Sequence, residues 1–464
     1  MKSKKLLVLG AGPGGYAAAF MAADKGMDVT LVDSNPKPGG VCLHKGCIPS
    51  KTLLHLAKLI HKTREAKAWG LDFGTPGIDL EAMRQWGNQV IDKMASGLTL
   101  LAKQRGVKWI QGHGIFKDSN SVEVSNGDRI SFDQCILATG SSPFLPPGIP
   151  DNNPSIMDST SALQLEKIPK RLLVIGGGYI GLEMGTVYSA LGSQVSVVEI
   201  MDSLLPGVDS DLVRPLSNKL KQEFENIHLN TTVAGLNDSS DGIKVDFQEN
   251  EKRWEGNFDR ILVSAGRKPN TGGIGLEHTK VETDKLGRVK TDGQFRTADS
   301  AIMAIGDIVD GPPLAHKASQ EGKRAVEILS GEIPGTAGAI PVVVFTDPEI
   351  AWCGILESEA KSTGLEISVA KYPWGASGRA QTLGRTEGMT KLVIDPKTER
   401  ILGVGLVGVE VGELIAEGVL ALKMGATVHD LADSIHPHPT LSETLMEAAE
   451  AYLGRSTHIY KKKR

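Results

Sequence analysis

The 464-residue chain has few cysteines, few aromatic residues and little net charge. Four cysteines are too few for a secreted scaffold held together by disulfides, and two of them, Cys135 and Cys353, lie in apolar, strand-like surroundings that predict core positions. Aromatic residues make up 5%, which argues against an aromatic-rich β-sandwich. The net charge of −4 gives no broad electrostatic footprint for nucleic acid or an anionic membrane. Long uncharged apolar runs are missing as well, so we expect no membrane-spanning helix.

The two ends of the sequence show no targeting signal. The apolar run from Leu6 to Leu9 is short and leads straight into a glycine motif, unlike a signal peptide. The basic run Lys461, Lys462, Lys463 and Arg464 is expected to be a solvated tail rather than a binding patch. We therefore expect a cytoplasmic protein, in which a disulfide needs a chemical reason.

Glycine is abundant, with 54 residues of 464, whereas its usual share is about 7%. The excess is not periodic and hydrophobic residues reach 40%, which excludes collagen and disorder. Much of the apolar content is Val, Ile, Leu and Ala, which favours buried parallel strands covered by helices. The length suggests about three domains.

One pattern occurs twice, in residues 5–33 and 171–199. Each copy has an apolar strand, a G-x-G-x-x-G turn, a helical stretch and a second strand that ends in an acid. In this motif the first glycine makes a tight turn, the second lets the backbone approach a pyrophosphate, and the third lets helix and strand pack closely. Because both copies have the strand–turn–helix context, they predict two dinucleotide sites. The residues concerned are Gly10, Gly12, Gly15 and Asp33, and Gly176, Gly178, Gly181 and Glu199.

The remaining segments predict an α/β fold. Helices are expected over 51–69 and 79–105, short strands over 107–137, helix and strands over 205–266, and a strand over 301–307. From about residue 340 the pattern becomes that of a separate C-terminal α/β domain, with helices at 410–424 and 441–453. We therefore expect two Rossmann-like dinucleotide-binding domains followed by a third α/β domain.

Cys42 and Cys47 are separated by four residues, just after the first nucleotide motif. An ideal helix would hold their sulfurs too far apart to bond, but Gly46 allows a distortion that brings the Cα atoms within about 7 Å. A thiolate near a helix N-terminus has a lowered pKa, which favours thiol–disulfide exchange. Three alternatives stay open: a metal site with His44, which lacks a fourth ligand, two unlinked core cysteines, and a purely structural disulfide.

Together these motifs resemble those of the FAD-dependent pyridine nucleotide–disulfide oxidoreductases, and within that family the members that oxidise dihydrolipoamide. The resemblance covers nearly the whole chain. It rests on C-x4-C-I-P-S-K at 42–51, ILATGS at 136–141, GGGYIGLE at 176–183, AIGD at 304–307, LAHKASQEG at 314–322, FTDPEI at 345–350 and HPHPTLSE at 436–443. It implies oxidation of protein-bound dihydrolipoamide to lipoamide and reduction of NAD+ to NADH, through FAD and a redox-active disulfide of Cys42 and Cys47.

The resemblance also implies domain limits and partners. The first part of the FAD domain, with the disulfide, covers 1–150, the NAD domain 151–270, the rest of the FAD and central part 271–338, and the dimerisation domain 339–464. It implies a homodimer that serves the lipoyl domains of a 2-oxoacid dehydrogenase or glycine-cleavage complex. Neither nucleic acid nor membrane is an expected partner.

The cofactor positions follow from the same resemblance. Asp33 would bind the adenosine ribose of FAD, where the family more often has Glu. Glu199 favours NAD over NADP, because a carboxylate accepts a hydrogen bond from the ribose 2′-OH and repels a 2′-phosphate. The implied FAD residues are Gly10, Gly12, Gly15, Asp33, Lys51, Gly114, Gly140, Asp307 and Ala315. The implied NAD residues are Gly176, Gly178, Gly181, Glu199, Gly266 and Arg267.

The resemblance implies that Cys47 lies against the flavin and that Cys42 faces the substrate. Lys51, which by itself would pass for a helix-surface lysine, would contact the flavin and stabilise its reduced form. It would also pair with Glu183, which would otherwise pass for a solvated helix residue.

The matching motif places His438 as the catalytic base and Glu443 as its partner, both reaching the active site of the other subunit. His436 is the less favoured base. From the residues alone, Thr440 and Glu443 also fit a helix capping box, and His436 and His438 could form part of a metal site that lacks further ligands.

Other functions fit less well. A reductase of the glutathione type is opposed by the absence of cations after Glu199, and a mercuric reductase by the absence of a C-terminal cysteine pair. A flavin-dependent NADH oxidase or transhydrogenase is opposed by the presence of both Cys42 and Cys47, and a non-catalytic subunit by the intact redox positions. Val41, His44 and Lys45 depart from the family pattern, and the positive charge that His44 and Lys45 add near the thiolate would shift the redox poise of the disulfide.

Overall fold

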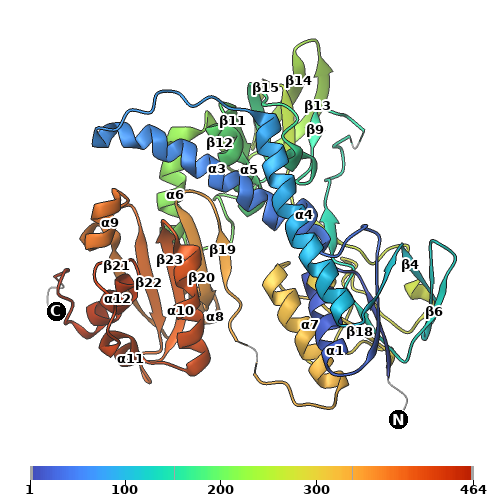
Figure 1. Cartoon of the computed structure of the whole chain (residues 1–464). Helices are drawn as coiled ribbons and strands as arrows, with labels where there is room; N and C mark the ends of the chain where they lie inside the picture. The colour runs from blue at the N-terminus through green and yellow to red at the C-terminus, as the bar shows by residue number, and fades with distance from the viewer. Residues whose placement is uncertain (1–3, 151, 337, 461–464) are drawn as a thin grey trace.

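The computed structural model describes residues 4–150, 152–336 and 338–460. The basic run at 461–464 lies outside the described residues, so its exposure stays a prediction. The described residues form three five-stranded sheets, two parallel and one antiparallel, each with its own helices, together with three smaller sheets (Figure 1). No helix within the described ranges combines the length and apolarity needed to cross a membrane.

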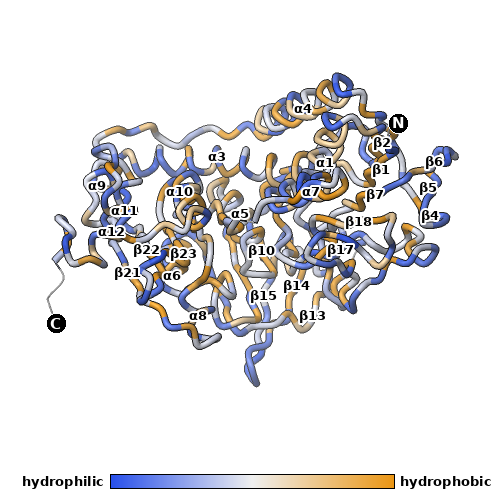
Figure 2. Tube along the Cα trace, turned by 90° about the horizontal axis from the view of Figure 1, so that it is seen from below, coloured by the Kyte–Doolittle hydropathy of each residue, from blue (hydrophilic) through white to orange (hydrophobic). Residues whose placement is uncertain are grey.

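The first nucleotide motif forms the centre of a parallel sheet with strand order β18-β7-β1-β2-β3. Its strands are β1 (Lys5–Leu9), β2 (Asp28–Asp33), β3 (Lys108–Gln111), β7 (Gln134–Leu137) and β18 (Ile302–Ala304). Helices α1 (Pro13–Asp24) and α7 (Ala315–Leu329) pack against each other beside it. Because the central strands are buried on both faces, they are continuous apolar runs, which Figure 2 colours orange. Residues 1–150 and 271–338 thus contribute strands to one sheet.

The second motif forms the centre of a second parallel sheet, with strand order β12-β11-β10-β16-β9. Its strands are β9 (Ile156–Met157), β10 (Arg171–Ile175), β11 (Gln194–Val198), β12 (Asn226–His228) and β16 (Arg260–Val263), with helices α5 (Tyr179–Ala190) and α6 (Ser210–Glu223). An antiparallel sheet of β13 (Thr232–Ser239), β14 (Gly242–Glu249) and β15 (Lys252–Phe258) adjoins it. A short pair, β8 (Ser141–Pro143) and β17 (Arg267–Pro269), links the two nucleotide units.

The segment after residue 340 forms an antiparallel sheet with strand order β19-β20-β23-β22-β21. Its strands are β19 (Val342–Val344), β20 (Glu349–Gly354), β21 (Ser368–Pro373), β22 (Met389–Ile394) and β23 (Ile401–Gly408). Its helices are α8 (Glu357–Thr363), α9 (Gly378–Leu383), α10 (Val411–Met424), α11 (Val428–Asp433) and α12 (Glu443–Leu453). The helices expected at 410–424 and 441–453 are confirmed as α10 and α12.

Cys42 and Cys47 lie on consecutive helices that follow the first nucleotide motif. Helix α2 (Gly40–Lys45) leads into α3 (Cys47–Glu65), which a 3-10 turn continues to Trp69, and α4 (Leu80–Gln104) follows. These confirm the helices expected at 51–69 and 79–105. The short strands expected over 107–137 include β4 (Gly114–Asp118), β5 (Ser121–Val124) and β6 (Arg129–Ser131). Cys135 and Cys353 are buried, as predicted.

Candidate active site

The two glycine loops have the same backbone geometry. Gly10 and Gly176 have φ angles of +103° and +109°, which side chains other than glycine rarely adopt. A Cβ at Gly15 would lie 1.8 Å from the carbonyl oxygen of Gly10, and one at Gly181 would lie 2.3 Å from that of Gly176. The turn and the close helix–strand packing therefore explain the first and third glycines of each motif.

Contacts with other protein atoms do not explain why the second residue of each motif, Gly12 or Gly178, is a glycine. A Cβ at Gly178 would meet no atom within 4 Å, and one at Gly12 would meet only the Cα of Gly40, at 4.0 Å. The space above both loops is therefore open, while the N-terminus of a helix points to it. This geometry fits the approach of a pyrophosphate.

The two acids are also placed alike. Asp33 Oδ2 accepts a hydrogen bond of 2.7 Å from the Ala11 N–H, and Glu199 Oε2 accepts one of 2.7 Å from the Gly177 N–H. The other oxygen of each carboxylate accepts a backbone N–H from two residues further on. Each acid is thus fixed beside the middle residue of its G-x-G turn, where a ribose bound at the loop would meet it.

A cavity of about 720 Å³ joins the first loop to the two cysteines. It brings together residues from every segment of the chain that the expected FAD site uses. These are Gly10, Gly12, Asp33, Lys51, Gly114, Gly140, Asp307 and Ala315, together with Cys42, Cys47 and Glu183. Gly15 lies behind the loop, and the expected NAD residues Gly176, Gly178, Gly181, Glu199 and Gly266 are not among the residues that line this cavity.

Arg267, which was expected at the NAD site, lines this same cavity. Its Nε donates a hydrogen bond of 2.7 Å to Ser141 Oγ, which donates one of 2.5 Å to Asp307 Oδ2. The pairing of β17 with β8 places Arg267 there. Ser141 therefore joins two predicted site residues, although the sequence pattern indicated no role for it.

The backbone breaks at Gly46, between the two cysteines. Helix α2 ends at Lys45, Gly46 has φ −152° and ψ −112°, and α3 begins at Cys47. Both cysteines are free thiols joined by a hydrogen bond. The distortion predicted for Gly46 therefore brings the two side chains together.

His44, considered above as a possible metal ligand, is engaged elsewhere in this structure. Its Nε2 lies 3.2 Å from the carbonyl oxygens of both Lys37 and Pro38. The Nε2 atom of His44 therefore already has hydrogen-bond partners in the main chain.

The two thiols differ in acidity. The pKa of Cys47 is lowered to about 7, mainly by the hydrogen bond from Cys42, while burial opposes the shift and Lys51 adds to it. The hydrogen bond to Cys47 and burial both raise the pKa of Cys42 well above its ordinary value. In the dithiol state Cys47 therefore ionises at lower pH than Cys42.

Lys51 and Glu183 form the expected pair. Lys51 Nζ lies 2.8 Å from Glu183 Oε2 and 4.5 Å from the centre of the Phe345 ring. The other oxygen of Glu183 accepts a hydrogen bond of 3.0 Å from the Phe345 N–H. The buried carboxylate therefore holds the lysine within the cavity, near Cys47.

His438 and Glu443 contact each other in the C-terminal domain. His438 Nδ1 lies 2.8 Å from Glu443 Oε1, and the His438 side chain is 72% exposed. Glu443 Oε2 accepts a hydrogen bond of 2.7 Å from the Thr440 N–H, which is one half of the capping box considered above. The other half is missing: the N-cap of α12 is Ser442, without a side-chain capping bond, and the Thr440 hydroxyl donates to the Pro437 carbonyl. Neither His438 nor Glu443 lines the cavity of its own chain.

His436 has a different environment. Its Nε2 lies 2.7 Å from Glu417 Oε1, and the side chain is only 8% exposed. The hydrogen bond that His436 donates to Glu417 raises the pKa of His436. His436 is thus held in a partly buried pair with Glu417, whereas His438 faces solvent.

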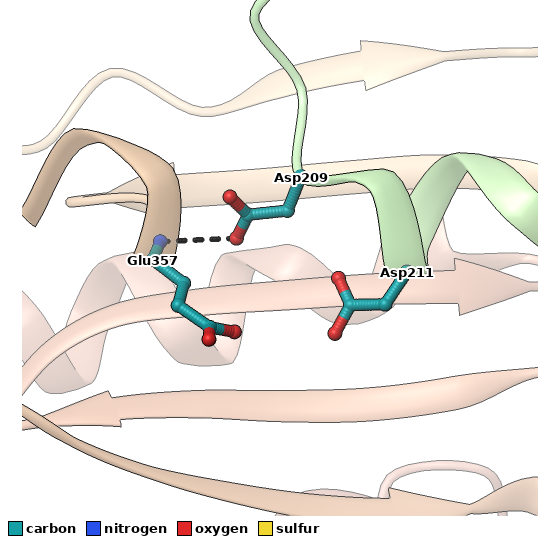
Figure 3. A group of neighbouring side chains, drawn as sticks. All are labelled: Asp209, Asp211 and Glu357. Carbon is teal, nitrogen blue, oxygen red and sulfur yellow. Dashed lines mark hydrogen bonds between the residues drawn. The ribbon is translucent and has the colours of Figure 1, made fainter. Parts of the chain in front are cut away.

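Three acids, Asp209, Asp211 and Glu357, lie close together in Figure 3, with carboxylate oxygens within 4.8 Å of one another. Lys391 Nζ lies 2.6, 2.7 and 3.3 Å from them and its side chain is 1% exposed. Burial raises the pKa of Asp209, but hydrogen bonds from Lys391 and Ser358 outweigh it and hold this pKa at about 2. The ammonium group thus supplies the positive charge that these acids require, and it ties α6 to β22 and α8.

Two tyrosines near the cysteines were missed by the sequence reasoning. Tyr179 is the first residue of α5 and lines the cavity, where burial raises its pKa to about 12. Burial and the nearby Cys42 and Cys47 raise the pKa of Tyr16, in α1. Tyr179 stands inside the GGGYIGLE motif, so the motif itself was the available signal.

Two nucleotide loops, a cavity and a cysteine pair with unequal acidity define a pyridine-nucleotide-dependent disulfide oxidoreductase. Residues 4–322 match the pyridine nucleotide-disulphide oxidoreductase family, and residues 340–449 match the dimerisation domain of that family. The chain belongs to this family. FAD and NAD are therefore its cofactors, and the dimerisation domain supports a homodimer.

Relatives of known name cover the chain almost completely. It is 42% identical to the dihydrolipoyl dehydrogenase of Vibrio cholerae over 460 residues, covering 98% of this chain and 97% of that protein. It is 43% identical to that of Thermus scotoductus, covering 99% of each. Among solved structures, LpdA from Mycobacterium tuberculosis superposes with a TM-score of 0.88 at 26% identity, covering 96% of this chain and 99% of that chain. The flavoprotein disulfide reductase RclA from Escherichia coli gives 0.86 at 27%, with the same coverage.

Proposed function

We propose that this protein oxidises dihydrolipoyl groups, carried on the lipoyl domains of a 2-oxoacid dehydrogenase or glycine-cleavage complex, and reduces NAD+ to NADH. The observation that carries the proposal is the unequal pair of thiols in the cavity: a low-pKa Cys47 beside a high-pKa Cys42. An exchange centre needs one sulfur that leaves as a stable thiolate and one that is attacked. The dihydrolipoyl dehydrogenases at 42–43% identity support this substrate class.

The cysteines carry the first half of the reaction, starting from their disulfide. His438 takes the proton of one substrate thiol, and the resulting thiolate attacks Cys42 Sγ. The Cys42–Cys47 bond breaks, and Cys47 leaves as a thiolate that Lys51 stabilises. The second substrate thiol then closes the lipoyl disulfide and releases Cys42, so two electrons have passed from substrate to the cysteine pair.

FAD, when bound, supplies an acceptor for that electron pair and a donor of hydride to NAD+. The residues that would hold it are those of the first loop, with Asp33, Lys51, Asp307 and Ala315 at the cavity. The second loop and Glu199 would hold NAD+. Both loops fit, because their second glycines leave open space for a ligand.

We infer that the base comes from the other subunit. His438 is exposed and lies outside the cavity of its own chain, while the domain that carries it matches a dimerisation domain. In the homodimer the partner subunit's His438 would therefore reach Cys42. Glu443 would orient the imidazole and favour its protonated form.

The test is anaerobic turnover of the purified protein with dihydrolipoamide and either NAD+ or NADP+. We expect turnover with NAD+ and much less with NADP+. His438→Gln should lower the rate about 100-fold to 10,000-fold, while NADH still reduces the bound flavin. Equal turnover with NADP+, or none with dihydrolipoamide, would overturn the proposal.

A further inference from the structure

A line of hydrogen bonds runs through the interior of the C-terminal domain and ends beside Glu443. Trp374 Nε1 donates to Thr390 Oγ1 at 3.0 Å, and the Thr390 hydroxyl donates to Thr444 Oγ1 at 2.8 Å. The Thr444 hydroxyl donates to the Leu441 carbonyl at 2.7 Å. The line thus crosses from the sheet to the first turn of α12.

The three side chains in this line are fully buried. Trp374, Thr390 and Thr444 each have 0% exposure. Each hydroxyl has one proton to give, and each gives it to the next group, so the direction of every bond is fixed. In an environment without water, such bonds polarise one another, and the loss of one partner leaves a buried polar group unsatisfied.

Two glycines pack their backbone against the indole at the start of the line. A Cβ at Gly388 would lie 2.4 Å from an indole carbon of Trp374, and one at Gly408 would lie 2.3 Å from another. Gly388 precedes β22 and Gly408 ends β23, at the same end of this antiparallel pair, and both let the backbone close on the ring. The Trp374 indole holds the Thr390 hydroxyl through the hydrogen bond that its Nε1 donates.

The other end of the line lies next to the acid–base pair. Thr444 and Glu443 are adjacent residues in the first turn of α12. Glu443 uses one oxygen for His438 Nδ1 and the other for the Thr440 N–H. A shift of this turn would therefore move the carboxylate, and with it the imidazole that it orients.

We propose that Thr390 and Thr444 are positioning residues for the His438–Glu443 pair, held in place by Trp374. They contact neither substrate nor cofactor, and they act through the first turn of α12. The proposal rests on the proposed function, in which His438 is the base. In this proposal the buried hydroxyl groups of Thr390 and Thr444 fix the position of His438, whose side chain is exposed.

The test compares two variants of one residue. Thr444→Val keeps the shape and removes the hydroxyl, whereas Thr444→Ser keeps the hydroxyl. We expect Val to lower kcat for dihydrolipoamide oxidation about tenfold with little change in KM for NAD+, and Ser to restore it to within about twofold. Reduction of the flavin by NADH should be unchanged in both, because that step does not use His438.

Two further variants keep the test decisive. If Thr444→Val does not fold, Thr390→Val and Trp374→Phe break the same line further from α12 and should lower kcat in the same selective way.

Thr186→Val is the control, because Thr186 is a buried threonine of α5 that donates to the Leu182 carbonyl at 2.8 Å, outside the C-terminal domain. It should keep kcat.

Each result has one meaning. Failure of the wild type to oxidise dihydrolipoamide would overturn the proposed function. A wild type that is active, with Thr444→Val equally active, or with flavin reduction by NADH lowered as much as kcat, would overturn the positioning role alone.

Discussion

Lys51 Nζ lies 2.8 Å from Glu183 Oε2, although the two residues are 132 positions apart in the chain. The pair joins α3, which begins at Cys47, to α5, which follows the second nucleotide loop. Its two charges act on Cys47 with opposite sign: Lys51 lowers the pKa of the thiol and Glu183 raises it. One ion pair thus links the two nucleotide units and tunes the redox centre between them.

Substitutions in this pair should change the reactivity of Cys47 in opposite directions. Lys51→Met removes the cation and raises the pKa of Cys47, so the reduced protein should react with iodoacetamide about threefold more slowly at pH 6.5. Glu183→Gln removes the opposing anion and should speed the reaction. Rates that move in the same direction in both variants would contradict this account.

The reduced protein should form the Cys47 thiolate as the pH rises through about 7. Below that pH the thiol is protonated and unreactive, because only the thiolate is nucleophilic. The ultraviolet absorbance of the thiolate, followed against pH, measures the midpoint.

The hydrogen bond from Cys42 is the main cause of this low pKa, which gives a second measurement. Cys42→Ala removes the donor and should move the midpoint to higher pH, whereas Cys42→Ser retains a donor and should keep it low. The same midpoint in Cys42→Ala and Cys42→Ser would show that another group is responsible.

Lys391→Met should destabilise the protein by about 3–5 kcal/mol, because it leaves three acids without their buried counter-charge. Lys371 provides the control, since it pairs with Asp211 at 2.6 Å but its side chain is 43% exposed. Lys371→Met should cost less than about 1 kcal/mol. Urea unfolding of both variants measures the difference, and equal costs would refute the role of burial.

Gly178→Ala and Gly181→Ala should separate ligand binding from folding. A Cβ at Gly178 meets no protein atom within 4 Å, so the fold should survive while NADH binding weakens about tenfold or more. A Cβ at Gly181 would lie 2.3 Å from the Gly176 carbonyl oxygen, so that variant should lose about 1–3 kcal/mol of stability. Thermal unfolding and NADH titration measure the two effects, and unchanged NADH affinity in Gly178→Ala would count against the site.

Much of this site could be predicted from local sequence. The positive φ angles of Gly10 and Gly176, and the contacts of Gly15 and Gly181 with the carbonyl oxygens of Gly10 and Gly176, arise within one strand–turn–helix unit that a short motif specifies. The break at Gly46 is equally local, because it depends on one residue between two short helices. The helices 51–69, 79–105 and 410–424 followed from periodicity for the same reason.

Other features depend on residues that meet only in the folded chain. Arg267 lines the cavity through Ser141 because β17 pairs with β8, and no pattern in either segment predicts that register. Lys391 is buried among acids of α6 and α8, and in the sequence it is one lysine among many. Thr390 and Thr444 are unremarkable residues until the sheet and α12 pack together.

The sequence by itself determined the two nucleotide loops, the cysteine pair and its helix, because each depends on the backbone of a few consecutive residues. Only the tertiary structure decided the charges that act on Cys47, since Lys51 and Glu183 reach it from two different helices. It also decided that His438 faces solvent while His436 is buried, although two positions separate them. Hydrogen bonds and burial depend on residues that are far apart in the sequence. The chemistry of the few cysteines in this chain therefore depends on its tertiary structure.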